Sequence, residues 1–391
     1  VSATSDVTPP GAAPGVRASG DPSVTTPATV TITEASEAGC KDGTCNHLIE
    51  GTSGTIKVAS GIHHIILKDV TVAPDPAPSG ACPAFEVSEY ATVNLELQGT
   101  NTLTSAEGLA GIYVAAHGKL IIEGAASDST LNVTGGVGGA GIGGYGAGSE
   151  PCGDITINSG IINATGGRNC AGIGGAAYSP GGTITINGGT VTAIGGEKSS
   201  SMSGGMGIGC GGQYANGSSQ TKLLGRVVVN GGKIKAIGGA NGTEPKSSGI
   251  GCATLETTLT NGEATIITNA IDRKTSIASL QGIVWDETEE NGIVHGRATL
   301  KESLRGDQNP PPQTLTIPGG CGLIIPINGN LRHPEGAKIY GNGTIVNANN
   351  LLVTGGSISD TITRSVSLSE DDVVATDMEY TGEDLTRQAI K

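Results

Sequence analysis

The sequence predicts an all-β fold, namely a parallel β-helix: a solenoid with three short strands per coil, an irregular insertion and further β coils toward the C-terminal end. One observation is a repeat, because Gly-Ile-Gly begins at Gly141, Gly172, Gly207 and Gly249, at spacings of 31, 35 and 42 residues. Another is that two short β-type runs follow each of the first three marks, and glycine separates all three runs of such a unit, as in one coil of a solenoid. The last is composition: with 66 Gly, one Trp and one Phe, the core must be built from Ile, Val, Leu and Ala.

The two runs that follow each mark define the second and third strands of a coil. Alternation of side chains predicts that Ile155 and Ile157 point inward on one strand, and Ile162 and Ala164 on the next. Asn158, Asn187 and Asn230 recur at one place in the coil, so we interpret them as structural corner residues that hydrogen-bond between coils. The runs are Asp154–Asn158, Thr183–Asn187 and Arg226–Asn230, then Ile161–Thr165, Thr190–Ile194 and Lys233–Ile237.

The pattern extends toward the N-terminus in a weaker form, which predicts five to seven stacked coils. Between Trp285 and Pro312 the coil pattern is absent, and the segment contains an acidic cluster and three consecutive prolines. We expect this segment to be a connection or a side subdomain. The predicted organisation is an N-terminal extension and cap (1–44), a β-helix body (45–280), the connecting segment (281–312), C-terminal β coils (313–375), and a linker or the start of a following module (376–391).

Charge and hydropathy exclude several classes of partner. The formal net charge of −14 disfavours a basic face for nucleic acid or anionic membranes. No apolar run reaches the roughly 18 residues of a membrane span. The first residues lack the features of a signal peptide, so we expect an already processed or trimmed terminus.

The eight cysteines form an even set without a Cys-x-x-Cys pair, which favours disulfides in an oxidising compartment over a zinc site. Cys210 and Cys252 directly follow Gly-Ile-Gly, so we expect them to pair between adjacent coils. A second expected pair is Cys152 with Cys170, from loops flanking one coil. The pairing of the remaining cysteines stays open; these are Cys40, Cys45, Cys82 and Cys321. The alternative for the whole set of eight is that several are free, buried, small hydrophobic residues.

Aromatic residues are scarce, so their positions indicate where a ligand could bind. Tyr145, Tyr178 and Tyr214 each follow a Gly-Ile-Gly mark by a few residues, which predicts a ladder of rings along one side of the solenoid. Tyr113 and Glu86 occupy equivalent outward positions of two earlier coils. Sugar binding needs ring faces and a few fixed polar groups, and these tyrosines are the predicted ligand-binding residues.

The outward glycines of the Gly-Ile-Gly runs have two interpretations. These residues are Gly143, Gly174, Gly209 and Gly251. The strip without side chains could be an open trough in which a polymer lies against backbone, or glycine could be required because neighbouring loops fold down over the sheet. The sequence does not separate the two.

An enzymatic role is the alternative hypothesis. Glycoside hydrolysis needs two carboxylates about 5 to 10 Å apart, and Glu150 with Asp154 is the pair near the tyrosine loops. A second mixed group upstream repeats no known catalytic signature; it contains Glu86, Glu89, Glu96, Tyr113 and His117. Because a fold alone does not license a function, we favour binding over catalysis.

The stretches "GGAGIGGYG", "CAGIGGAAYSPGGTITINGGTVTAIGG" and "GMGIGCGG" resemble the repeats of surface proteins from Gram-positive bacteria. The resemblance covers about residues 45 to 255 and implies a right-handed β-helix similar to that of pectate lyases. It also implies carbohydrate-binding, adhesin-like behaviour.

These observations lead to one functional expectation. We expect the monomeric, glycan- or polysaccharide-binding head of a longer protein displayed outside the cell. The alternative is a β-helix glycoside hydrolase or polysaccharide lyase. We expect no metal site and no cofactor, although acidic residues are numerous enough for Ca²⁺, and neither nucleic-acid binding nor membrane insertion.

Overall fold

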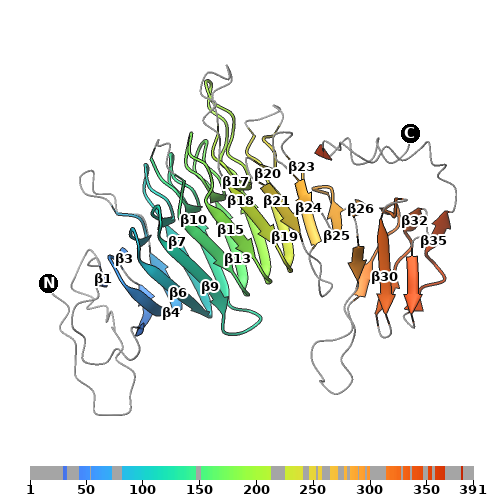
Figure 1. Ribbon diagram of the computed structural model, residues 1–391, viewed down its shortest axis with the longest axis horizontal. Helices are drawn as coiled ribbons and strands as arrows, with labels where there is room; N and C mark the ends of the chain where they lie inside the picture. The colour runs from blue at the N-terminus through green and yellow to red at the C-terminus, as the bar shows by residue number, and fades with distance from the viewer. Residues whose placement is uncertain are drawn as a thin grey trace, which may run out of the picture.

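The computed structural model shows an all-β molecule built from stacked parallel strands, drawn as a long rod in Figure 1. No helix able to cross a bilayer occurs in the part of the chain that the structure describes. The described residues are 30–32, 44–52, 54–72, 82–146, 151–212, 225–240, 246–251, 254–257, 265–271, 277–279, 282–288, 290–295, 297–299, 314–326, 329–334, 337–346, 351–354, 357–365 and 380–381.

The main stack has three faces, and each coil contributes one strand to each face. We call the Gly-Ile-Gly side the short-strand face; it continues parallel from β1 to β23, and β36 (Tyr380–Thr381) adds to it in the antiparallel sense. Its strands are β1 (Val30–Ile32), β3 (Ile56–Val58), β5 (Phe85–Val87), β8 (Ile112–Val114), β11 (Ile142–Gly143), β14 (Ile173–Gly174), β17 (Ile208–Gly209), β20 (Ile250–Gly251) and β23 (Ala270–Ile271).

The other two faces belong to one continuous sheet, because the long strands β2 (Thr44–Thr52) and β4 (Ile62–Val72) lie across both at the N-terminal end. The second face contains β6 (Thr92–Gln98), β9 (Lys119–Gly124), β12 (Asp154–Ile157), β15 (Thr183–Ile186), β18 (Arg226–Val229), β21 (Thr254–Thr257) and β24 (Ile277–Ser279). The third contains β7 (Thr100–Thr104), β10 (Thr130–Thr134), β13 (Ile161–Thr165), β16 (Thr190–Ile194), β19 (Lys233–Ile237), β22 (Thr265–Thr268) and β25 (Gly282–Trp285).

The registers confirm the inward columns predicted from alternation. Ile155 pairs with Ile184, and Ile184 pairs with Val227, on the second face; Ile162 pairs with Val191 on the third. All of these side chains are buried. One face of each strand is buried and the other faces outward, so apolar residues alternate with polar ones, which is why the pattern was visible in the sequence.

The corner asparagines form the predicted ladder between coils. Asn187 donates from Nδ2 to Oδ1 of Asn158 at 2.9 Å, and Asn230 donates to Oδ1 of Asn187 at 2.8 Å. A second, shorter ladder joins Asn163 to Asn132 at 2.9 Å on the third face. The structural interpretation of the three corner residues is therefore confirmed.

The direction of the chain reverses after the main stack. β26 (Asn291–His295) pairs antiparallel with β25, and then with β29 (Gly322–Ile324) in the parallel sense. From this hairpin a second stack begins, visible in orange and red in Figure 1. Its other strands are β27 (Arg297–Thr299), β28 (Thr314–Thr316), β30 (Asn330–Pro334), β31 (Lys338–Tyr340), β32 (Thr344–Val346), β33 (Leu351–Thr354), β34 (Ser357–Ile358) and β35 (Thr363–Ser365).

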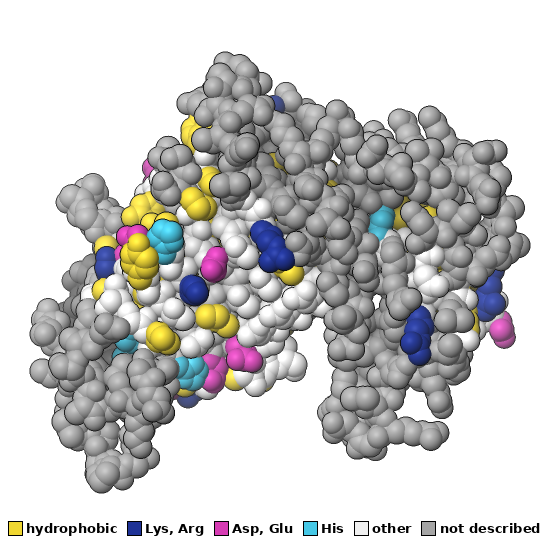
Figure 2. Space-filling view, in the orientation of Figure 1, with side chains coloured by type: hydrophobic (Ala, Val, Ile, Leu, Met, Phe, Trp, Pro, Cys, Tyr) yellow, Lys and Arg dark blue, Asp and Glu magenta, His cyan; other side chains and the backbone are white. Residues whose placement is uncertain are grey.

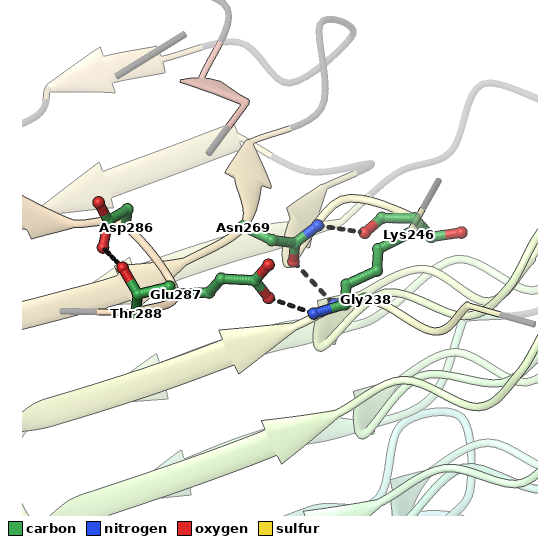
Figure 3. A network of polar contacts seen from close by, with 7 residues as sticks. Gly238, Lys246, Asn269, Asp286, Glu287 and Thr288 are labelled. Atoms are coloured by element: carbon green, nitrogen blue, oxygen red, sulfur yellow. Dashed lines mark hydrogen bonds and ion pairs between the residues drawn. The ribbon is translucent and has the colours of Figure 1, made fainter. Parts of the chain in front are cut away.

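The turn of this hairpin is tied to the main stack by polar contacts. Asp286 is buried, and its carboxylate accepts hydrogen bonds from Thr288 Oγ1 at 2.8 Å and from the Glu290 amide at 3.0 Å. Glu287 forms an ion pair with Lys246, which lies between β19 and β20 of the main stack (Figure 3). Apolar side chains on both sides of the hairpin belong to one continuous core cluster. The second stack therefore continues the core of the first.

Two parts of the predicted organisation contain strands that were not expected there, and the number of coils also differs. β1 lies in the predicted N-terminal extension, yet it pairs with β3 and belongs to the main stack. The described stack also has more coils than the five to seven expected. Part of the predicted connecting segment, 282–299, holds β25, β26 and β27. These strands were not predicted, because the antiparallel hairpin of β25 and β26 does not follow the repeat of the solenoid coils.

Candidate functional site

The residue type in the outward column of the short-strand face changes from coil to coil along the stack. Lys57, Glu86 and Tyr113 are successive register partners, and Gly143 follows Tyr113. Lys57 Nζ lies 2.8 Å from Glu86 Oε1, which also accepts a hydrogen bond from Ser88 Oγ at 2.8 Å. The first coils therefore present charged and aromatic groups where the later coils present only glycine.

Tyr145 brings a second ring to this column. It directly follows the Gly-Ile-Gly-Gly run of its own coil, and a bridge to Gly139 holds its backbone. Its ring contacts that of Tyr113 on the preceding coil, with 4.4 Å between centroids and an interplanar angle of 68°, an edge-to-face arrangement. Tyr145 remains 39% exposed, so part of this aromatic surface faces solvent.

Tyr90 and His117 form a second pair at the turn that leads from the short-strand face to the second face. Each residue has a left-handed backbone, with φ of 63° and 64°, at equivalent places of successive coils. Their rings stack almost in parallel, with 5.3 Å between centroids and an angle of 8°. Tyr90 is the most exposed large hydrophobic side chain of the described chain, at 72%.

The two pairs share one electrostatic environment. Burial, the neighbouring Tyr145 and the carboxylates of Glu86 and Glu89 raise the pKa of Tyr113. A hydrogen bond to Glu89 raises the pKa of the Tyr90 hydroxyl. We call this surface the aromatic corner; it consists of Lys57, Glu86, Glu89, Tyr90, Tyr113, His117 and Tyr145.

Figure 2 shows hydrophobic, acidic and histidine side chains gathered together on the N-terminal half of the visible face. The aromatic corner belongs to the coils of that half, β3 to β11. The arrangement offers exposed ring faces with fixed carboxylate, ammonium and hydroxyl groups around them. Such a surface can stack on the apolar face of a sugar and hydrogen-bond to its hydroxyls.

The predicted tyrosine ladder stays a prediction, because only two of its three members, Tyr145 and Tyr178, lie in the described residues. Tyr113 and Tyr145 come together as ring neighbours, although they were assigned to separate groups. Tyr178 lies farther along the stack, half-buried, in a left-handed turn whose amide donates to the Gly212 carbonyl at 3.1 Å. Tyr214 lies outside the described residues.

The open-trough interpretation of the outward glycines is wrong. Gly143 and Gly174 are buried and have φ of 137° and 131°. A Cβ on Gly143 would lie 2.0 Å from the Gly174 carbonyl oxygen, and one on Gly174 would lie 2.0 Å from the Gly209 carbonyl oxygen. Glycine is required at these two positions because any side chain would collide with the backbone of the next coil. The backbone of both residues is buried and does not line an open groove.

The structure describes one member of the predicted catalytic pair. Glu150 lies outside the described residues, and Asp154 is exposed as the first residue of β12, paired in register with Lys119. The second group is largely brought together at the aromatic corner. Its remaining member, Glu96, lies on the second face, 3.2 Å from His64 Nε2. Within the described ranges, no three His, Cys, Asp or Glu side chains are placed to hold a metal ion.

The predicted pairing of Cys152 with Cys170 is not formed. Both are buried free thiols. Cys152 lies where the chain leaves the short-strand face for β12, and Cys170 lies where the chain enters that face at β14, so they lie at opposite edges of the face. Burial raises the pKa of Cys152 to about 11 and that of Cys170 to about 12. They are core residues, as the alternative interpretation had it. Cys252 lies outside the described residues, so its pairing with Cys210 stays a prediction, although Gly209 and Gly251 before them are register partners.

Sequence reasoning overlooked Tyr90 and Lys57. A signal was present: Tyr90 stands five residues after Phe85, and His117 stands five residues after Ile112, so the two rings have the same place in successive coils. Lys57 has no such signal, because its role depends on the ion pair with Glu86.

Comparison of the chain with models of known protein families, with curated proteins and with solved structures found no match.

Proposed function

We propose that this protein is the glycan-binding head of an adhesin-like protein displayed at a cell surface, and that the aromatic corner is its binding site. The observation that carries the proposal is the exposed ring surface made by Tyr90, Tyr113, His117 and Tyr145 on adjoining coils. Large aromatic groups are rare in this chain, with one Phe and one Trp, and Phe85 and Trp285 are buried in the core. Exposing four rings in one region is therefore a costly arrangement that a ligand would explain.

The polar groups around the rings support a sugar ligand in particular. Glu86 is fixed by Lys57 and Ser88, so one carboxylate and one ammonium group have defined positions beside Tyr113. Fixed polar groups around an apolar platform give orientation and specificity, as carbohydrate hydroxyls require. The site extends over several adjoining coils, about 4.8 Å apart, which suits an extended polymer.

The test is retention on immobilised polysaccharides of different charge: neutral galactomannan, acidic polygalacturonate and cationic chitosan. We expect the wild-type protein to bind at least one of them. Tyr113→Ala and Tyr145→Ala should each weaken binding about tenfold, because each removes a ring face and its neighbour's packing partner. Their double-mutant cycle should give a coupling of about 1 kcal/mol.

Tyr340→Ala is the matched control. Tyr340 is a similarly exposed tyrosine, at 42%, but it lies on β31 of the second stack. Its substitution should leave binding unchanged. Equal losses for Tyr340→Ala and Tyr113→Ala would show that binding does not depend on the aromatic corner.

The same materials test for catalysis. Labelled oligosaccharides from the three polymers, incubated with the protein, should remain intact if the corner only binds. Products that disappear on Glu86→Gln or Asp154→Asn substitution would replace the binding proposal by a glycoside hydrolase or lyase activity.

A further inference from the structure

Two histidines are buried next to each other inside the first coils of the main stack. His47 on β2 is 3% exposed and His63 on β4 is 0% exposed. His47 Nε2 lies 3.0 Å from His63 Nδ1, and His63 Nε2 lies 2.7 Å from the Ser60 carbonyl oxygen. The rings are 5.1 Å apart. The proposed function assigns no role to this pair.

The contacts define which nitrogen carries each proton. A carbonyl oxygen only accepts, so His63 must hold its proton on Nε2 and present Nδ1 as an acceptor. His47 must then donate from Nε2, which leaves its Nδ1 without a proton. His47 Nδ1 is buried and has no hydrogen-bond partner among the described residues. In this arrangement each ring carries one proton, and an N–H formed at His47 Nδ1 would have no hydrogen-bond acceptor among the described residues.

Charged and titratable groups near the pair point away from it. Lys57 on β3 pairs with Glu86, Glu50 on β2 pairs with Lys68, and His64 on β4 pairs with Glu96 on β6, all on the outer surface. Asp69 on β4 is exposed and accepts from the Thr100 amide. The strand neighbours that point inward, such as Ile49, Ile65 and Val93, are apolar. The side chain of Cys45 on β2 is not among those described.

The histidine pair is connected to the aromatic corner through the turn between β3 and β4. His63 closes this turn by its bond to Ser60, and the Gly61 carbonyl accepts from the Thr92 amide at 2.8 Å, two residues after Tyr90. β3 itself carries Lys57, whose ion pair holds Glu86. Loosening this coil would weaken both the hydrogen bond between Thr92 and Gly61 and the ion pair between Lys57 and Glu86, which support the aromatic corner.

We infer that the His47–His63 pair makes the aromatic corner acid-sensitive: protonation of the pair opens the β3–β4 coil and lowers glycan affinity. The inference rests on the proposed function for its ligand, but the opening of the coil does not. A proton added to His47 Nδ1 puts a charge in an apolar core and creates an N–H without an acceptor. An opened coil hydrates that charge.

The sign of the pH dependence follows from burial. Burial, and secondarily His63, lower the pKa of His47 from 6.5 to about 4. The opened state therefore binds more protons than the folded state between these values, so stability is complete above pH 6.5 and is lost as pH falls toward 4. From about pH 7 to about pH 4.5 the equilibrium constant for opening should rise roughly 50-fold for His47 alone.

Hydrogen exchange read by mass spectrometry tests the inference on the whole chain. Rates corrected for intrinsic exchange are compared at about pH 7 and about pH 4.5 for peptides from 54–72 and 82–91, with 151–196 as internal reference. Opening should increase in the first two regions and not in the third. In the same samples, retention on galactomannan, polygalacturonate and chitosan should fall at the acidic pH.

Two variants separate the histidine pair from general acid effects. His47→Leu/His63→Gln retains a donor for the Ser60 carbonyl and removes both imidazoles, so its exchange and retention should no longer depend on pH in this range. His64→Gln changes an outward histidine on the same strand and should behave as wild type. Equal acid responses in wild type and double variant would overturn the inference, as would coil opening without loss of retention. If no polysaccharide is retained at either pH, the proposed function fails, whereas wild-type-specific opening still supports the acid response of the corner.

Discussion

At the scale of single residues, the backbone of the short-strand face explains the abundance of glycine. Gly174 combines a left-handed φ of 131° with a neighbouring carbonyl oxygen only 2.0 Å from where a Cβ would stand. Both features arise from close stacking of coils. The repeated Gly-Ile-Gly motif is therefore a packing motif, and the functional candidates are side chains that lie outside it.

Gly174→Ala should destabilise the protein by about 3 kcal/mol, because backbone strain adds to overpacking against the next coil. Urea unfolding followed by circular dichroism measures the loss. Gly319→Ala serves as control, since its nearest neighbour is 3.7 Å away and no left-handed φ is involved. A loss at Gly174 as small as that at Gly319 would contradict the packing explanation.

At the scale of elements, stacked polar side chains hold the corners of the coils in register. Asn187 lies in the middle of its ladder and takes part in two side-chain hydrogen bonds, whereas Asn230 takes part in one within that ladder. The inward columns supply the apolar burial, but a slip between coils would also break these ladders. The asparagines therefore both specify register and add stability.

Asn187→Ala should cost about 2 kcal/mol and Asn230→Ala about 1 kcal/mol, because the first substitution removes two hydrogen bonds and the second removes one. The comparison uses urea midpoints of the two variants with unchanged slopes. Equal costs would indicate that each asparagine acts alone through its own turn and not through the ladder.

At the scale of the whole molecule, the hairpin of β25 and β26 joins two stacks of opposite strand direction through one core. Asp286 holds its turn: beyond Thr288 and Glu290, its carboxylate accepts from the amide and the side chain of Asn291, each at 3.1 Å. Its neighbour Trp285 is the single tryptophan of the chain and is buried at this junction. The junction therefore contains its own fluorescent probe.

Asp286→Ala should uncouple the stacks, because four hydrogen bonds to a buried carboxylate are lost, with a cost of about 3 kcal/mol. Tryptophan emission should then shift to the red at lower urea than the circular dichroism transition of the main stack. Glu287→Gln, which removes only an exposed ion pair, should shift the transition by less than about 1 kcal/mol. Coincident transitions in Asp286→Ala would show that the junction does not depend on this turn.

The sequence by itself determined the β-helix, the inward columns and the role of the corner asparagines. These features are local and periodic: alternation within a strand and recurrence from coil to coil settle which side chains meet, because parallel coils stack in register. Ile155, Ile184 and Val227 could be assigned to one column on this basis alone.

Only the tertiary structure decided the features that depend on loops and turns. The contact of Tyr145 with Tyr113, the stack of Tyr90 on His117 and the burial of Gly143 depend on how non-repeating segments fold onto the neighbouring coil. The reversal at β25 and β26 likewise breaks the period on which prediction relied. Periodicity specifies what repeats along the stack, and the candidate site is built from residues that do not repeat.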